Sequence, residues 1–282
     1  MDTWVGYWGR LRPARAALAA GARVVTWGAL ADRSSRLAAG LASAGAGPGN
    51  RIGGLSRDPV GVVEVIAACA WLGAVAVPLD PASDSGQLTE RVGLFALVTD
   101  PGELLGPDPL SSAIETGMDE PLLLLSPEAA VLTHGNVEAV AVAAIAADGL
   151  VPPDCVGIAL PSMATPAALA ATLGALHAGA LTRFGDIAAL LGDEDLPRPT
   201  VLVTTRDELE RPGVIERVAG AGLRLVKVPG PVPEALRREW GTRATPFVEV
   251  SGLSLQGSPY LESDELVPLL GMEDLALEGR RP

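Results

Sequence analysis

The side chains best suited to acid–base or nucleophilic chemistry are few in this sequence of 282 residues, which contains two histidines and two cysteines. His134 titrates near neutral pH and is the first candidate for a general base. Ser126, Glu128 and Thr133 precede it closely and could complete a hydrogen-bonded catalytic set. The competing interpretation is structural, because a helix is expected to start near Asn136 and His134 would then cap it.

The other histidine and both cysteines are better explained by structural roles. His177 lies at the end of an expected helix, where a cation complements the helix dipole. Cys69 falls within an apolar run and is expected to be a buried free thiol, and no base lies near Cys155 in the sequence. The spacing of these residues matches no metal site, so we predict no metal and no cofactor. Free thiols favour a reducing, cytoplasmic location.

The overall charge limits the classes of partner. Acidic residues number 34 and basic residues 21, which gives a net charge of −13. This balance disfavours nucleic acids and anionic membranes, because both attract basic surfaces. Lys227 is the only lysine, so a mechanism that needs two lysines is excluded. The apolar stretch Val60–Val77 contains Glu64, and we expect a helix buried in a globular core there rather than a membrane span.

The elements that would position these residues alternate regularly between helix and strand. Short apolar strands between helices predict an α/β fold with mainly parallel sheets flanked by helices. The expected helices are 29–44, one opening at Asp58-Pro59, 137–147, 166–178, 186–191, 207–220 and 233–240. The expected strands are 51–55, 74–78, 94–99, 156–160, 181–184, 201–204, 223–228 and 247–250.

The helix–strand alternation runs in two series, one before residue 100 and one after residue 127, and these two series predict two lobes. Residues 100–127 are rich in proline, glycine and acidic side chains and are expected to be a linker or surface loop. The first α/β lobe, with the N-terminal segment and this linker, would therefore span 1–127, and the second 128–282. Near the N-terminus, Trp4, Tyr7 and Trp8 form a patch with helical spacing. This patch could dock a partner or a second subunit, or it could fold onto the body as a lid.

Several segments, in order along the chain, carry a family resemblance. Val25–Leu41, Gly47–Ile52 and Ala70–Pro81 resemble the opening of an adenylate-forming enzyme, and Val131–Asn136 resembles the tail of that family's phosphate-loop motif. The family includes acyl-CoA synthetases, nonribosomal peptide adenylation domains and luciferases. The resemblance implies two α/β lobes with a substrate groove between them. It also implies a shortened member, because the chain ends at Pro282 without the family's C-terminal domain.

The resemblance also shows where this sequence departs from the family. The family's glycine-rich phosphate loop ends in lysine, whereas the matching segment, Leu122–Ala130, has neither residue type and carries Glu128. In the adenine motif, Ser251 replaces an aromatic residue and Leu255 replaces a glutamate that binds Mg²⁺. Ser162 and the two residues after it stand where an acyl-site aromatic residue or histidine is usual. The remaining candidate ligand contacts are Ser251, Gly252, Ser254, Pro229 and Gly230.

These departures together predict a protein that has lost ATP and Mg²⁺ chemistry. The ligand would be an acyl or polyketide-like molecule, or the partner a pathway enzyme or carrier protein of natural-product biosynthesis, and a homodimer is an expected assembly. One alternative is an ATP-independent cyclase, isomerase or hydrolase that uses the groove. A second is a residual AMP-dependent acyl-CoA ligase whose missing domain is supplied in trans. Fold resemblance alone does not choose among the three.

Overall fold

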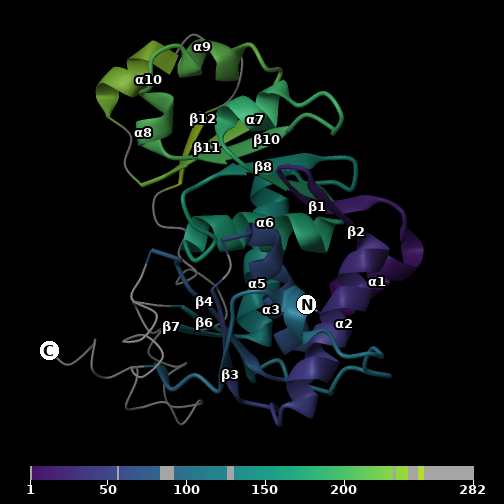
Figure 1. The fold of residues 1–282 in the computed structure, drawn as a ribbon. Coiled ribbons are helices and arrows are strands. Elements are labelled where there is room, and N and C mark those ends of the chain that lie inside the picture. Colours follow the sequence, from purple (N-terminus) through teal and green to yellow (C-terminus); the bar gives the residue numbers. More distant parts are fainter. Residues whose placement is uncertain are drawn as a thin grey trace, which may run out of the picture.

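The protein is described here from a computed structural model, which places residues 2–55, 57–82, 92–125, 130–230, 233–240 and 247–250. The described residues form two sheets with helices between and around them, as expected for an α/β fold (Figure 1).

The smaller sheet has five strands in the order β5-β3-β4-β6-β7. Its first four strands pair in parallel, and β7 pairs antiparallel with β6. The strands are β3 (Arg51–Gly54), β4 (Val75–Pro78), β5 (Ala96–Val98), β6 (Pro121–Leu125) and β7 (Ala130–Thr133).

The larger sheet has seven strands in the order β12-β11-β10-β8-β9-β1-β2. All neighbours pair in parallel except β1 and β2, which form an antiparallel hairpin at one edge. The strands are β1 (Ala16–Ala20), β2 (Arg23–Thr26), β8 (Cys155–Ala159), β9 (Leu181–Phe184), β10 (Val201–Thr204), β11 (Leu225–Pro229) and β12 (Phe247–Val250).

The helices form two layers. In Figure 1, α3, α5 and α6 lie between the sheets, with α1 and α2 beside them, and α7 to α10 lie on the outer side of the larger sheet. The helices are α1 (Asp2–Leu11), α2 (Trp27–Ser43), α3 (Pro59–Leu72), α5 (His134–Asp148), α6 (Pro166–Ala178), α7 (Ile187–Gly192), α8 (Arg206–Leu209), α9 (Val214–Ala219) and α10 (Glu234–Trp240), with a 3₁₀ turn at Pro101–Leu104.

The central helix α3 explains why two sheets can share one core. It contacts β1 of the larger sheet and β3, β4 and β6 of the smaller one. Its apolar side chains surround the whole helix, which is the pattern of a helix with no solvent-facing side. Asp58 caps its start by accepting a hydrogen bond from the Val60 N–H, with Pro59 in the first turn, as the sequence predicts.

Sheet membership crosses the predicted lobe boundary at residue 127. Strands β1 and β2 come from the N-terminal part but join the larger sheet, and β7 comes after the boundary but completes the smaller sheet. Each sheet thus contains strands from both sides of residue 127. Whether the parts before and after this residue fold as separate units stays a prediction.

Two local expectations are wrong. The segment 100–127 is not only linker, because Pro121–Leu125 forms the largely buried strand β6. The expected helix 207–220 is two short helices, α8 and α9, separated by Pro212. Proline lacks the N–H that a continuous helix needs and clashes with the preceding turn.

The N-terminal aromatic patch folds onto the body. Trp4 is buried and its ring meets His177 edge-on, with centroids 4.5 Å apart. The Trp8 indole N–H donates to the His177 carbonyl at 3.2 Å, and only Tyr7 of the three is exposed. Among the described residues, no helix is both long and apolar enough to span a membrane.

Candidate functional site

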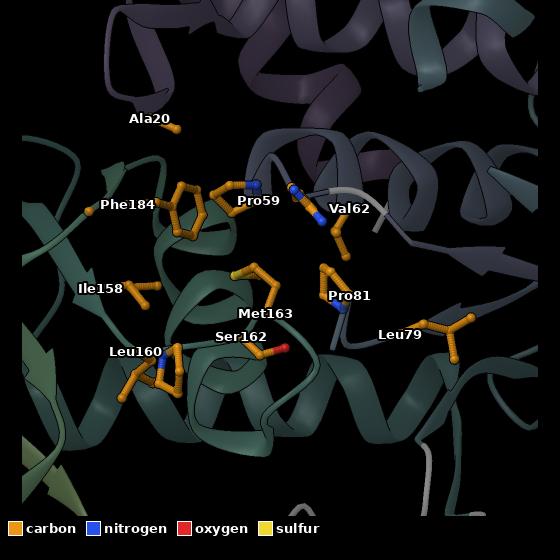
Figure 2. A pocket seen from close by; sticks show the side chains of 13 residues that line it. Ala20, Pro59, Val62, Leu79, Pro81, Ile158, Leu160, Ser162, Met163 and Phe184 are labelled. Atoms are coloured by element: carbon orange, nitrogen blue, oxygen red, sulfur yellow. The ribbon is translucent and has the colours of Figure 1, made fainter. Parts of the chain in front are cut away.

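A cavity of about 240 Å³ lies between the two sheets. Figure 2 shows side chains from several elements turned toward it. It is lined by Ala20, Arg57, Pro59, Val62, Leu79, Pro81, Ile158, Leu160, Pro161, Ser162, Met163, Phe184 and Gly185. We call this cavity the inter-sheet pocket.

The pocket lies at the carboxyl ends of parallel strands. The segments that follow β8 and β9 supply one wall, and the start of α3 and the residues after β4 supply the other. The strand order β9-β8-β10-β11-β12 is the doubly wound 2-1-3-4-5 arrangement, in which ligands bind in the crevice outside the carboxyl ends of the strands. The switch point of this order lies between β8 and β10, and the inter-sheet pocket lies beside it, at the carboxyl ends of β8 and β9.

A hydrogen-bonded turn fixes the floor of the pocket after β8. The Ser162 hydroxyl accepts from the Ala164 N–H at 3.1 Å, and the Thr165 hydroxyl donates to the Ser162 carbonyl at 3.0 Å. Thr165 also caps α6 by accepting from the Ala168 N–H. Because the turn is held at both ends, the buried Met163 side chain is kept in the pocket (Figure 2).

Arg57 is the charged side chain among the residues that line the pocket. It is exposed and makes no ion pair or hydrogen bond with the described residues. The adjacent Asp58 is already engaged, because it accepts from Arg23 and from the Val60 N–H. The guanidinium is therefore not engaged by the described residues and is available to an anion.

The two described members of the predicted catalytic set, Thr133 and His134, do not line this pocket. Thr133 is fully buried and caps α5: its hydroxyl accepts from the Asn136 N–H at 3.1 Å, while its own N–H donates to the Asn136 side-chain oxygen at 3.0 Å. His134 is buried at the first turn of α5, and its backbone N–H donates to the Glu120 backbone carbonyl at 2.9 Å. Ser126 and Glu128 lie outside the described residues.

Two of the predicted ligand contacts, Pro229 and Gly230, lie elsewhere. Pro229 ends β11 and Gly230 follows it with φ of +83°, a conformation that favours glycine, and neither lines the inter-sheet pocket. Ser251, Gly252 and Ser254 lie outside the described residues. Of the three positions that match the family's acyl site, Ser162 and Met163 line the pocket and Ala164 does not.

The cysteines are not placed for nucleophilic chemistry. Cys69 and Cys155 are both buried and free of disulfides, in agreement with the expectation for Cys69. Burial raises the pKa of the Cys69 thiol far above its usual range and that of Cys155 to about 12. A thiol must ionise to attack, so neither side chain is a nucleophile near neutral pH.

Comparisons with known proteins agree with the fold. Residues 7–94 match the AMP-binding enzyme family. Feruloyl-CoA synthases from Amycolatopsis and Streptomyces are each 30% identical over 166 residues, which cover 49% of this chain and 34% of the relative. Over part of its length, the chain is similar to the adenylate-forming enzymes. It spans about a third of the length of these curated relatives.

Solved structures of adenylate-forming enzymes share the architecture. O-succinylbenzoate coenzyme A synthetase from Bacillus subtilis, in complex with AMP, superposes with a TM-score of 0.78 at 21% identity, covering 90% of this chain and 60% of that one. The N-terminal subdomain of NpsA from Klebsiella oxytoca, in complex with 3-hydroxyanthranilyl-AMSN, gives 0.76 at 18% identity, covering 90% and 72%. At these identities the likeness establishes the fold alone.

Strands β6 and β7 flank the segment that, in the sequence, matches the phosphate loop of the adenylate-forming enzymes. Leu125 of β6 pairs with Ala130 of β7, so residues 126–129 alone connect them. Those four residues are Ser, Pro, Glu and Ala. The connection thus lacks the glycines and the lysine with which a phosphate loop cradles a triphosphate.

The only lysine of the chain is paired with a buried aspartate and does not line the inter-sheet pocket. Lys227 lies in β11 and is buried, and its ammonium donates to both carboxylate oxygens of Asp148 at 2.8 and 2.7 Å. Asp148 ends α5, where a carboxylate opposes the helix dipole, so the lysine stabilises both a buried charge and a helix terminus. Lys227 is therefore a structural residue.

Proposed function

We propose that this protein binds a small acyl-type ligand in the inter-sheet pocket and does not activate it with ATP. The observation that carries the proposal is the pairing of Leu125 with Ala130, which leaves four residues, none of them glycine or lysine, at the place of the phosphate loop. A triphosphate needs several backbone N–H groups and nearby cations, and Glu128 would repel it.

The charges around the fold support the same proposal. Adenylation must neutralise charge on the α-phosphate and on the departing pyrophosphate. Lys227 holds Asp148, and the family's position for a Mg²⁺-binding glutamate matches Leu255 in this sequence. The pocket, in contrast, has a mostly apolar lining, as expected of a site for a small organic ligand.

The absence of ATP chemistry is testable by calorimetry. We expect ATP with Mg²⁺ to give no binding heat up to millimolar concentrations, and we expect no pyrophosphate exchange with any added carboxylic acid. Micromolar binding of ATP, or acid-dependent exchange, would overturn the proposal. An active acyl-CoA synthetase run in parallel verifies that the exchange assay detects turnover.

Ligand binding at the pocket is tested by filling it. Met163→Trp places a larger side chain in the cavity and should abolish the thermal shift that a bound small acid produces in the parent protein. Met118→Trp is the matched control, because Met118 is exposed and lies outside the pocket. Equal thermal shifts in both variants would place the ligand elsewhere.

A further inference from the structure

Helix α5 is apolar on the side that faces away from the core as well as on the side that faces it. Among the described helices it packs on α6, and its core side also contacts β6 and β7. The outward side is exposed or half-buried, and its residues, at helical spacing, are Gly135, Ala139, Val142, Ala143 and Ala146. A helix that is apolar all round is normally covered on every side. We therefore expect the outward side of α5 to have a partner.

Two large apolar side chains continue this side beyond the ends of the helix. Met118 is 59% exposed and lies beside the first turn, because its carbonyl accepts from the Gly135 N–H at 2.7 Å. Val151, just after the last turn, is 49% exposed, and Val142 near the middle is 48% exposed. We call Met118, Val151 and the five outward residues of α5 the α5 surface. Contiguous exposed apolar surfaces of this kind mark contacts between proteins.

The α5 surface is symmetric about its middle. The midpoint lies between Val142 and Ala143, with Ala139 and Ala146 at equal distances on either side of it. The two large apolar side chains at the ends correspond to each other in the same way. A twofold axis through the midpoint places each residue against its counterpart in a second copy, as an isologous interface requires. The alanines allow the two helices to approach closely.

The exposed charges beside the two ends of the α5 surface are opposite in sign. Asp119 and Glu120 follow Met118 beside the first turn, and both are exposed. At the last turn the Arg224 guanidinium donates to the Asp148 carbonyl, and its side chain is 40% exposed although it also pairs with Asp154. An antiparallel second copy brings the acidic end of each helix near Arg224 of the other and opposes the two helix dipoles.

We propose that the α5 surface is the interface of a homodimer, in which α5 packs antiparallel on α5 of a second copy. Two copies of a chain with a net charge of −13 repel each other, and they repel least where the facing surfaces are uncharged, as these are. One helix of 15 residues with its flanking side chains forms a small interface, so the dissociation constant is expected to be micromolar. The interface is independent of the inter-sheet pocket.

The interface is tested by sedimentation equilibrium of the full 282-residue chain from low to high micromolar concentrations. The parent protein should dimerise. Val142→Arg should weaken dimerisation at least about tenfold, because an unpaired guanidinium would be buried between the helices. Val24→Arg is the matched control, because Val24 is 45% exposed, lies in β2 outside the α5 surface, and should leave dimerisation unchanged.

A parent protein that stays monomeric at every concentration would overturn the proposal. This is also the result expected if a different protein, or residues 251–282 of the same chain, covered the α5 surface. Equal dimerisation of the Val142→Arg variant and the parent would place the interface elsewhere and would overturn the proposal as well. None of these results depends on a ligand, so this proposal and the proposed function fail separately.

The antiparallel arrangement is tested by disulfide formation between two variants. Cys69 and Cys155 are buried, so a cysteine introduced on α5 is the accessible thiol among the described residues. In the antiparallel dimer Ala139 faces Ala146 of the second copy. Ala139→Cys mixed with Ala146→Cys should therefore form the mixed disulfide, under oxidised glutathione, faster than either variant forms a disulfide with itself. Faster self-linking of each variant would show a parallel arrangement and would overturn the antiparallel one.

Discussion

At the residue scale, the buried charged side chains of this protein have structural roles that their partners explain. The pair Lys227–Asp148 is buried on both sides, with side chains 8% and 5% exposed. Nearby, Arg224 and the Thr200 hydroxyl both donate to Asp154, at 2.9 and 2.6 Å. These charged side chains would be the first choices in a search for catalytic groups, but here they join structural elements. Lys227 joins β11 to the end of α5, and Asp154 joins the segment before β8 to the residues that precede β10 and β11.

Loss of Lys227 should destabilise the fold. Lys227→Met leaves the Asp148 carboxylate buried without its counterion, and breaking such a pair costs about 3–5 kcal/mol of unfolding free energy. Urea denaturation of the variant measures this cost. Arg206→Met removes an exposed pair with Asp207 and should cost less than about 1 kcal/mol. Similar losses in the two variants would contradict the structural role of Lys227.

Asp154 should make stability depend on acidity. Burial acts to raise the pKa of Asp154, but the hydrogen bonds from Thr200 and the Val151 N–H, together with Arg224, outweigh it and lower that pKa below its usual value. A lowered folded-state pKa gives stability that is complete above the unfolded pKa of about 3.9 and is lost as pH falls toward the folded pKa.

The expected measurement compares the parent protein with Asp154→Asn in urea from pH 7 to pH 3. The parent should be more stable by a constant amount between pH 7 and pH 5, and the difference should shrink below about pH 4. A difference that stays constant down to pH 3 would contradict the assignment.

At the scale of elements, α3 is held by charge as well as by packing. Glu64 is almost fully buried in this apolar helix, and it accepts from Arg23 at 2.7 Å and from Arg33 at 2.7 and 3.1 Å. Arg23 lies in β2 of the larger sheet and Arg33 in α2, so one carboxylate connects three elements. Arg23 also holds Asp58, the residue that begins the helix beside the pocket.

Neutralising Glu64 should therefore loosen the pocket as well as the core. Glu64→Gln keeps the shape but removes the charge, and should cost about 1.5–3 kcal/mol because hydrogen bonds to a charged group are lost. Asp32→Asn, which affects the exposed pair with Arg36, should cost no more than about 0.5 kcal/mol. Thermal melting with and without a small carboxylic acid would measure both effects, and equal melting temperatures for the two variants would refute the prediction.

At the scale of the whole molecule, each of the two sheets combines strands from both parts of the chain. The larger sheet needs β1 and β2 from the N-terminal part, and the smaller sheet needs β7 from beyond residue 127. We expect a single cooperative unfolding transition for the described body. The predicted partner protein, the homodimer and the cytoplasmic location stay predictions.

Cutting the chain at residue 127 tests this sharing. Fragments 1–127 and 128–282 should each fail to fold, because each loses strands and the α3, α5 or α6 surface that its sheet packs against. Circular dichroism and amide-proton dispersion in NMR spectra measure this directly. A fragment with a cooperative melt of its own would support the division predicted from the sequence.

Local sequence determined the elements whose signals lie within a few residues. Asp58-Pro59 fixes the start of α3, and the helix 166–178 is confirmed at both ends because Thr165 caps it and Gly179 ends it with φ of +73°. The helix–strand alternation gave the fold class, and the family motifs, in order along the chain, gave the relationship.

Tertiary structure alone decided the sheet partners and the site. Strands β1 and β2 are short, and β6 lies in a segment that reads as a loop, so only their pairing partners reveal them. Arg57, Met163 and Phe184 lie more than a hundred residues apart at the extremes and carry no shared motif. They meet because parallel strands bring their carboxyl ends to one edge of a sheet. The local sequence does not show that this edge of the larger sheet will face the same edge of the smaller sheet.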